Sequence, residues 1–99
     1  MIKIEVVSLY NGTAFYIKGT KVPHREDGPA VIFNNGKKEW WINGKRHRGD
    51  GPAIEFPNGD EMWALEGRYY SKEGWFNALS KENQMKMLYS EYFIRGQYD

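Results

Sequence analysis

A 23-residue repeat is the feature that most constrains how this 99-residue chain can fold. The segment His24–Ala30, HREDGPA, returns as His47–Ala53, HRGDGPA, so that position 24 maps onto position 47. The same interval separates other matching positions, namely Val31 and Ile54, Phe33 and Phe56, Asn35-Gly36 and Asn58-Gly59, and Trp40 and Trp63. A fixed period of this size is typical of a small supersecondary unit used more than once. We therefore expect a repeat fold in which the heptapeptide connects one unit to the next.

Each unit has the pattern of a β-hairpin. Residues 2–9 alternate apolar and polar side chains, and Asn11-Gly12 follows them as a dipeptide that tolerates positive φ in a tight turn. The scheme recurs over residues 29–42 around Asn35-Gly36, and once more around Asn58-Gly59. Three hairpins in series predict a six-stranded antiparallel meander.

Two-residue turns at the later Asn-Gly sites would set the pairing of the strands. Counting back from such turns places Val31 opposite Trp40 and Ile54 opposite Trp63, on one face of the sheet. That face then carries the expected core, which comprises Val31, Trp40, Ile42, Ile54, Phe56, Trp63 and Leu65. Trp41 falls on the other face, where it is a large ring among otherwise mixed side chains.

The pattern becomes helical after residue 70. Ser71 fits the N-cap of a short helix over residues 72–79, and Ser80 fits the N-cap of a second helix. Apolar residues recur at helical spacing in that second segment: Met85, Leu88, Tyr89, Tyr92 and Phe93. We also expect Trp75 and Phe76 to pack against the sheet.

The sequence as a whole predicts a single domain over residues 1–99 that is mainly β with C-terminal α. Residues 1–70 would form the hairpin repeats, an antiparallel meander of about three hairpins, and residues 71–99 a helical cap of two short helices. Such a cap covers the apolar layer that a terminal repeat otherwise exposes.

The composition argues against several classes of function. The chain has no cysteine, which removes disulfides and thiolate nucleophiles and fits a reducing compartment. A net charge of +1 provides no global attraction toward nucleic acid or an anionic membrane. No apolar run approaches the ~20 residues of a membrane span, and the first residues lack a signal-peptide pattern. We expect a cytoplasmic protein that does not span a membrane.

The repeated heptapeptide also supplies the one constellation that looks catalytic: His24, Arg25 and Asp27, with their copies His47, Arg48 and Asp50. A His–Asp pair can perform acid/base chemistry, and two His with two Asp can bind a metal. The structural alternative is that both Asp residues accept backbone N–H bonds while Arg and His brace neighbouring hairpins. We favour the structural interpretation, because a catalytic group is needed only once, whereas residues that stabilise a turn are needed in every repeat. The chain is therefore expected to be no enzyme and to use no cofactor or metal; a hydrolase built on His24 and His47 is the alternative.

The repeat resembles a known family. The residues that match a MORN-type repeat are Asn43-Gly44-Lys45, His47, Gly49, Gly51 and Phe56–Gly59. The resemblance covers about residues 13–70, and Glu26 departs from it by replacing the expected glycine. The His-Arg-x-Asp-Gly-Pro-Ala variant is more similar to short MORN-related proteins of bacteriophages and bacteria. This resemblance implies an elongated, twisted stack of antiparallel hairpins that serves as a scaffold for protein contacts, with lipid binding suggested for some members.

The function expected from these features is that of a non-catalytic protein–protein interaction module. The phage resemblance implies a small protein that inhibits or redirects a host protein, such as a defence-system component, in the manner of an anti-CRISPR inhibitor. An antitoxin-like binder is one alternative. The candidate partner-binding residues are Arg25, Lys38, Trp41, Arg46, Arg48, Tyr69 and Tyr92.

The basic run Lys45–Arg48 makes a nucleic-acid-binding module the second alternative. Basic side chains beside exposed aromatic rings can bind single-stranded nucleic acid through phosphate contacts and base stacking. Acidic residues lie close by in the sequence and the net charge is near zero, so a protein partner is favoured over nucleic acid. An open meander also leaves edge strands unpaired, which allows self-association.

Overall fold

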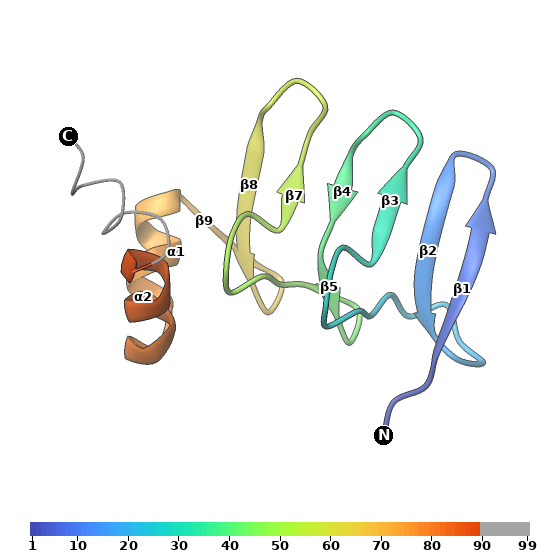
Figure 1. Cartoon of the computed structure of the whole chain (residues 1–99), viewed down its shortest axis with the longest axis horizontal. Coiled ribbons are helices and arrows are strands. Elements are labelled where there is room, and N and C mark those ends of the chain that lie inside the picture. The colour runs from blue at the N-terminus through green and yellow to red at the C-terminus, as the bar shows by residue number, and fades with distance from the viewer. Residues whose placement is uncertain (90–99) are drawn as a thin grey trace.

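The computed structural model describes residues 1–89 as an antiparallel β meander followed by two short helices (Figure 1). This confirms the predicted fold class. The strands and helices are β1 (Ile4–Leu9), β2 (Gly12–Ile17), β3 (Val31–Phe33), β4 (Lys38–Glu39), β5 (Trp41–Ile42), β6 (Lys45–Arg46), β7 (Ile54–Glu55), β8 (Glu61–Leu65), β9 (Arg68–Tyr70), α1 (Lys72–Ala78) and α2 (Lys81–Met87).

Seven of these strands form one sheet in the order β1-β2-β3-β4-β7-β8-β9, and every neighbouring pair is antiparallel. Figure 1 shows three upright hairpins standing side by side, β1–β2, β3–β4 and β7–β8. Lower hairpins turn in the opposite direction at β5–β6 and β8–β9. Their two-residue turns are Asn43-Gly44 and Glu66-Gly67, in which all four residues have positive φ. Positive φ at both positions defines a type I′ turn, whose twist matches that of the flanking strands.

The upper turns of the second and third hairpins have three residues, so the predicted strand register was wrong by one position. Val31 pairs with Glu39 rather than with Trp40, and Ile54 pairs with Met62 rather than with Trp63. In the second hairpin the turn is formed by residues 34–36, closed by a 2.9 Å bond from Phe33 N to the carbonyl oxygen of Lys37. Its glycine has a φ of 99°. A turn that ends on a left-handed glycine adds a bulge and therefore one residue.

The first upper turn also differs from the prediction. Leu9 pairs with Gly12, so the two turn residues are Tyr10 and Asn11 rather than Asn11-Gly12. Gly12 is the first residue of β2 and does not have positive φ. A Cβ atom on Gly12 would lie 2.2 Å from the carbonyl oxygen of Ile32. This glycine is required by close strand packing and not by turn geometry.

The register shift changes which residues form the core. Among the predicted core residues, Val31, Ile54 and Trp63 are buried, while Trp40, Ile42, Phe56 and Leu65 are only half-buried. Four alanines are completely buried between the hairpins instead: Ala14, Ala30, Ala53 and Ala64. Small side chains at these positions let adjacent hairpins approach closely.

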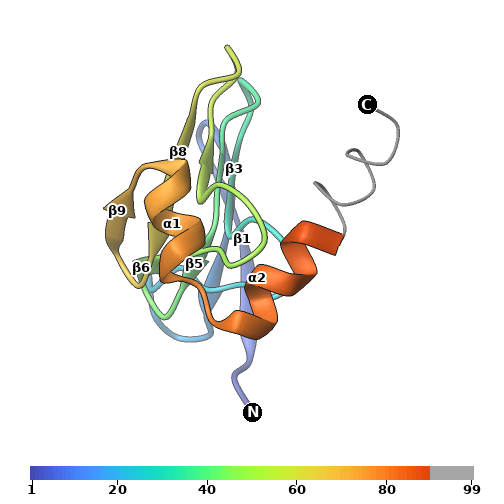
Figure 2. The same ribbon diagram turned by 90° about the vertical axis from the view of Figure 1, so that its left-hand side faces the viewer.

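The sheet has two distinct faces. Strand alternation places Phe15, Trp40 and Trp63 on one face, which is crossed by the two connectors, residues 24–29 and 47–52; we call it the connector face. The opposite face carries Glu39 and Trp41, and we call it the hairpin face. Figure 2 shows the lower hairpins and α2 on opposite sides of the sheet.

The helices begin where the sequence predicted, because Ser71 and Ser80 cap them by accepting bonds from Gly74 N and Asn83 N. Trp75 of α1 is buried and packs on Trp63, with ring centroids 4.6 Å apart. Phe76 is partly buried against the same cluster. The predicted positions Tyr92 and Phe93 lie outside the described residues. Within residues 1–89 no helix is long and apolar enough to cross a membrane.

Candidate interaction surface

The two histidines of the repeat hold neighbouring hairpins together. His24 Nδ1 accepts a 2.8 Å bond from the backbone N–H of Asn43, and His47 Nδ1 accepts a 3.0 Å bond from that of Glu66. Both donors are the first residue of a type I′ turn, 19 positions after the histidine. Each imidazole therefore ties its connector to the next lower hairpin. This geometry confirms that the histidines brace adjacent units.

Arg48 stabilises the second connector by bonding to residues of that connector and stacking on Trp40. Its Cζ lies 3.8 Å from the centroid of the Trp40 ring, and its Nη1 donates to the carbonyl oxygen of Pro52 at 3.1 Å. Nη1 also reaches Glu55 at 3.1 Å, while Nε donates to Asp50 at 2.9 Å. A planar guanidinium can stack on a ring and donate in its own plane at the same time. Only 19 % of the Arg48 side chain remains exposed, so it is largely committed within the chain.

Arg25 repeats this arrangement in the first connector. Its Cζ lies 4.0 Å from the Phe15 ring centroid, and it donates to Asp27 at 3.0 Å and to the carbonyl oxygen of Pro29 at 3.2 Å. The following Asp-Gly-Pro segment wraps around the guanidinium, and a Cβ at Gly28 would lie 3.0 Å from Cζ. The conformation of the heptapeptide is thus organised around its arginine.

The aspartates bond to the arginines, a role that the sequence did not predict. Asp27 and Asp50 each accept a bond from the neighbouring arginine Nε atom, and the Asp27 carboxylate also accepts one from its own backbone N–H, as predicted. The hydrogen bond and the charge of Arg25 hold the pKa of Asp27 below its ordinary value. Within the described part of the chain, no group of three or more His, Cys, Asp or Glu side chains is placed to hold a metal ion.

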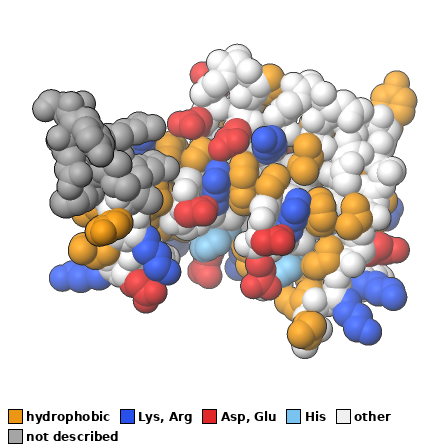
Figure 3. Space-filling model, in the orientation of Figure 1, with side chains coloured by type: hydrophobic (Ala, Val, Ile, Leu, Met, Phe, Trp, Pro, Cys, Tyr) orange, Lys and Arg blue, Asp and Glu red, His pale blue; other side chains and the backbone are white. Residues whose placement is uncertain are grey.

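Carboxylates dominate the outer surface of the connectors. The side chains of Glu26, Asp27 and Asp50 are 78 %, 86 % and 81 % exposed, whereas the arginines lie beneath them. Figure 3 shows this face, where acidic, basic and histidine side chains alternate with hydrophobic ones. An open groove of about 860 Å³ runs along it between the connectors and α2. The basic run seen in the sequence does not form a basic surface there.

A second cluster lies on the hairpin face around Glu39, which is only 5 % exposed. Trp41 Nε1 donates to Glu39 Oε1 at 3.0 Å, and Lys37 Nζ and Arg46 Nη2 reach Oε2 at 3.0 and 3.2 Å. Arg46 also lies 4.8 Å from the Trp41 ring centroid and donates to the Tyr69 hydroxyl at 2.5 Å. The buried carboxylate therefore holds two of the predicted contact residues directly, Trp41 and Arg46, and Arg46 in turn holds a third, Tyr69.

Opposing effects act on the carboxyl group of Glu39. Burial raises its pKa, but the hydrogen bonds from Trp41 and Lys37 and the charges of Arg46 and Lys37 outweigh burial and lower the pKa overall. The group is thus ionised and serves as a fixed negative centre. Sequence reasoning missed Glu39 because the predicted register placed it opposite Ile32 on a mixed face, with no cation beside it. Its position between Lys37 and Trp41 in a strand was the available signal.

The structure divides the predicted contact residues between two faces. Arg25, Arg48 and Lys38 lie on the connector face, since Lys38 pairs with Glu55, to which Arg48 donates. Trp41, Arg46 and Tyr69 converge on the hairpin face, and Tyr92 lies outside the described residues. These residues do not form one continuous surface.

The function of this chain must be inferred from its own geometry, because comparisons with known proteins found no match. No protein-family model, no curated protein and no solved structure matches this chain. The MORN-like resemblance therefore stays a prediction from the repeat motif.

Proposed function

We propose that this protein is a non-catalytic module that binds another protein through its hairpin face. The observation that carries the proposal is the cluster of Trp41, Arg46 and Tyr69, in which the buried carboxylate of Glu39 holds Trp41 and Arg46, and Arg46 bonds to Tyr69. Tryptophan, tyrosine and arginine are the residues most often found at the energetic centre of protein interfaces.

The cluster is arranged before any partner arrives. Arg46 is held by both Glu39 and the Tyr69 hydroxyl, so little side-chain freedom remains to be lost on binding. Exposed apolar area borders it, because Tyr69 is 46 % and Met62 39 % exposed. Farther along the same face, Lys37 Nζ lies between the rings of Phe33 and Phe56, at 5.3 and 5.2 Å from their centroids. An apolar centre with a polar rim is the usual composition of a protein-binding surface.

The finer identity of the partner is proposed from the repeat motif. The similarity of the His-Arg-x-Asp-Gly-Pro-Ala variant to short phage and bacterial MORN-related proteins supports a host protein as the target. On this proposal the protein acts in the host cytoplasm and inhibits or redirects a larger protein, such as a component of a defence system, or sequesters a toxin as an antitoxin does.

The connector face favours protein over nucleic acid as the partner. A nucleic-acid site needs free basic side chains toward the phosphates. Arg25 and Arg48 are instead occupied by carboxylates, carbonyl oxygens and aromatic rings, and the outermost groups are the acidic side chains of Glu26, Asp27 and Asp50. These carboxylates would repel the phosphate groups of a nucleic acid at the connector face.

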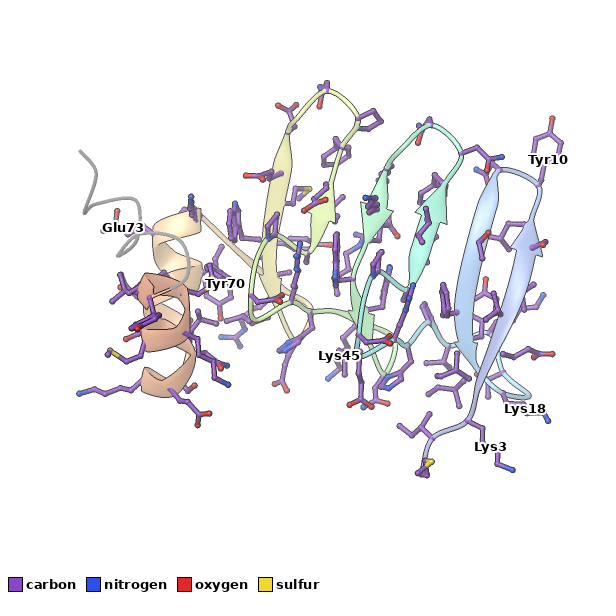
Figure 4. The ribbon with its side chains drawn as sticks, in the orientation of Figure 1. Lys3, Tyr10, Lys18, Lys45, Tyr70 and Glu73 are labelled. Carbon is purple, nitrogen blue, oxygen red and sulfur yellow. The ribbon has the colours of Figure 1, made fainter. Side chains whose placement is uncertain are left out.

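The test is capture of a partner from bacterial host lysate with tagged protein, followed by affinity measurement with the purified partner. Tyr69→Ala removes a central ring and is expected to weaken binding by about 30-fold, the effect typical of an interface hot spot. The control is Tyr10→Ala, because Tyr10 is another exposed tyrosine, 103 % exposed against 46 % for Tyr69, and stands at the tip of the first hairpin (Figure 4).

The two variants separate the proposal from its alternatives. Equal affinity of the Tyr69→Ala variant and the unaltered protein would exclude the hairpin face as the binding surface. Recovery of nucleic acid whose binding falls steeply as salt is raised would instead support the nucleic-acid alternative.

A further inference from the structure

Strand β1 is a long unpaired edge at one end of the sheet. It is the first strand in the sheet order and, within residues 1–89, pairs only with β2. The opposite end is the shorter strand β9, beside which α1 packs. Exposed apolar side chains gather on β1 and just before it, where Ile2, Ile4 and Val6 are 44 %, 36 % and 60 % exposed. A free edge of this length is a template for another strand.

The backbone of β1 alternates between groups bonded to β2 and groups that point outward. Lys18 N donates to the carbonyl oxygen of Lys3 at 2.8 Å, and the pairing continues to Leu9 opposite Gly12 next to the turn. In an antiparallel pair every second residue exchanges both of its backbone bonds with the partner. The odd-numbered residues from Lys3 to Leu9 therefore face β2. The outward N–H and C=O groups belong to Ile2, Ile4, Val6 and Ser8.

This alternation restricts how a second β1 strand can pair antiparallel to the first, because even-numbered residues must meet even-numbered residues. With Ile4 on the two-fold axis, Ile2 meets Val6 of the second copy, and Lys3 meets Glu5 of the second copy. Lys3 and Glu5 occupy the pairs that lack backbone bonds, in which side chains approach most closely. This charge pair occurs twice by symmetry.

The neighbouring registers are less favourable. A register that pairs Ile4 with Val6 places Glu5 against Glu5 of the second copy, and like charges directly opposite one another are destabilising. A register with Val6 on the axis places Ile4 against Ser8 and Glu5 against Val7. Only the register centred on Ile4 matches apolar with apolar and acid with base at every position.

We propose that the protein forms a two-fold dimer in which β1 pairs antiparallel with β1 of a second copy, with Ile4 on the axis. The two sheets then join into one continuous sheet. Figure 4 shows Lys3 at the outer end of the sheet, on the side away from the other hairpins. The hairpin-face cluster lies several strands away, so the dimer leaves the proposed partner surface free and does not depend on it.

The first test uses the lack of cysteine in the chain. Ile4→Cys places two thiols on the axis with Cα atoms about 5.5 Å apart, which is within disulfide range. Val6→Cys is the matched control, because in this register Val6 meets Ile2 and not itself. Oxidation is expected to cross-link the first variant and leave the second monomeric on a denaturing gel. Preferential cross-linking of Val6→Cys, or equal yields from both variants, would overturn the register.

The second test exchanges charges and measures dimerisation by sedimentation velocity over a concentration series. Lys3→Glu and Glu5→Lys each turn two attractive pairs into repulsive ones and should weaken the dimer at least about fivefold. Mixing the two variants restores both attractive pairs, so a heterodimer should reappear. A monomeric unaltered protein at all concentrations, or a mixture no more associated than its components, would overturn the proposal.

A third variant separates dimerisation from folding. Val6→Pro removes an outward N–H group that the β1–β2 hairpin does not use, and proline is tolerated at such edge positions. It should abolish the dimer while the circular dichroism spectrum stays that of the folded protein. Retention of the dimer by this folded variant would show that the contact lies elsewhere.

Discussion

At Gly51 a Cβ atom would lie 2.7 Å from the guanidinium carbon of Arg48. The backbone φ at this glycine is not positive, so the requirement for glycine is one of space. Gly28 meets Arg25 in the same way in the first connector, at 3.0 Å. At the residue scale, the repeated heptapeptide has one structural purpose in both copies. Its arginine stacks on an aromatic ring, and the following loop encloses the guanidinium, with a glycine that leaves space for it.

Gly51→Ala is expected to destabilise the protein by about 1–3 kcal/mol, because the new methyl group must displace Arg48 from the Trp40 ring or shift the loop. Urea unfolding followed by tryptophan fluorescence measures the change. The matched control is Gly49→Ala in the same connector, where a Cβ meets only the Asn83 side chain, at an ordinary 3.6 Å. An equal loss of stability in both variants would contradict the steric explanation.

At the element scale, the four Asn-Gly dipeptides are alike in sequence but differ in structure. Asn35-Gly36 and Asn58-Gly59 complete three-residue turns in which the Asn side chain accepts the N–H of the second residue after it. Asn11-Gly12 straddles the end of a two-residue turn and the start of β2. The lower turns, Asn43-Gly44 and Glu66-Gly67, are the type I′ turns. Turn type is therefore decided by how the flanking strands pair.

Gly12→Ala tests this distinction. We expect a loss of about 2 kcal/mol or more in the free energy of unfolding, because the methyl group would collide with the backbone of Ile32 and separate β2 from β3. Gly19→Ala is the comparison: its φ is 81° and no atom of the described residues lies within 4 Å of the added Cβ, so it should cost only about 1 kcal/mol from backbone strain. Equal effects in denaturant unfolding would argue that Gly12 is needed for turn conformation after all.

At the scale of the whole molecule, the Glu39 cluster joins two repeats across the hairpin face. Glu39 and Arg46 belong to one repeat, and Tyr69, bonded to Arg46, belongs to the next. On the connector face, His47 and the Trp75 indole, which donates to the carbonyl oxygen of Arg48 at 2.9 Å, extend the same linkage to the last hairpin and to α1. Polar bonds on both faces thus connect units that share only a thin apolar core.

The lowered pKa of Glu39 predicts acid sensitivity. Because this pKa is lower in the folded than in the unfolded chain, the stabilisation is complete above the ordinary value of 4.5 and is lost as pH falls through the folded-state pKa. Glu39→Gln should therefore lower stability at neutral pH and flatten its decline below pH 4.5. Urea unfolding at a series of pH values measures both effects.

Asp27→Asn provides the comparison for this prediction. The pKa of Asp27 is also lowered, from an ordinary value of 3.8, but its carboxylate is in solvent, where the attraction of Arg25 is screened. Its effect on the pH dependence should be the smaller of the two. A pH profile of Glu39→Gln parallel to that of the unaltered protein would refute the role of the buried carboxylate.

The predicted contact residues show how far sequence reasoning reached for the candidate site. Trp41 was singled out as a large ring on a mixed face, and the structure places it in a cluster with Arg46 and Tyr69. Arg25 and Arg48 were grouped with them because of their charge. Their side chains are used within the chain instead, which depends on rings 10 and 8 positions earlier, at Phe15 and Trp40.

The sequence by itself determined the repeat, the antiparallel hairpins and the two capped helices. These follow from local chemistry, since turn dipeptides, strand alternation and the N-cap serines Ser71 and Ser80 act within a few residues. Only the tertiary structure decided the register. One extra turn residue exchanges the two faces of a strand, and it brought Glu39 rather than Trp40 beside Val31. The bonds from each connector histidine to a turn 19 residues later were likewise decided by how the hairpins stack.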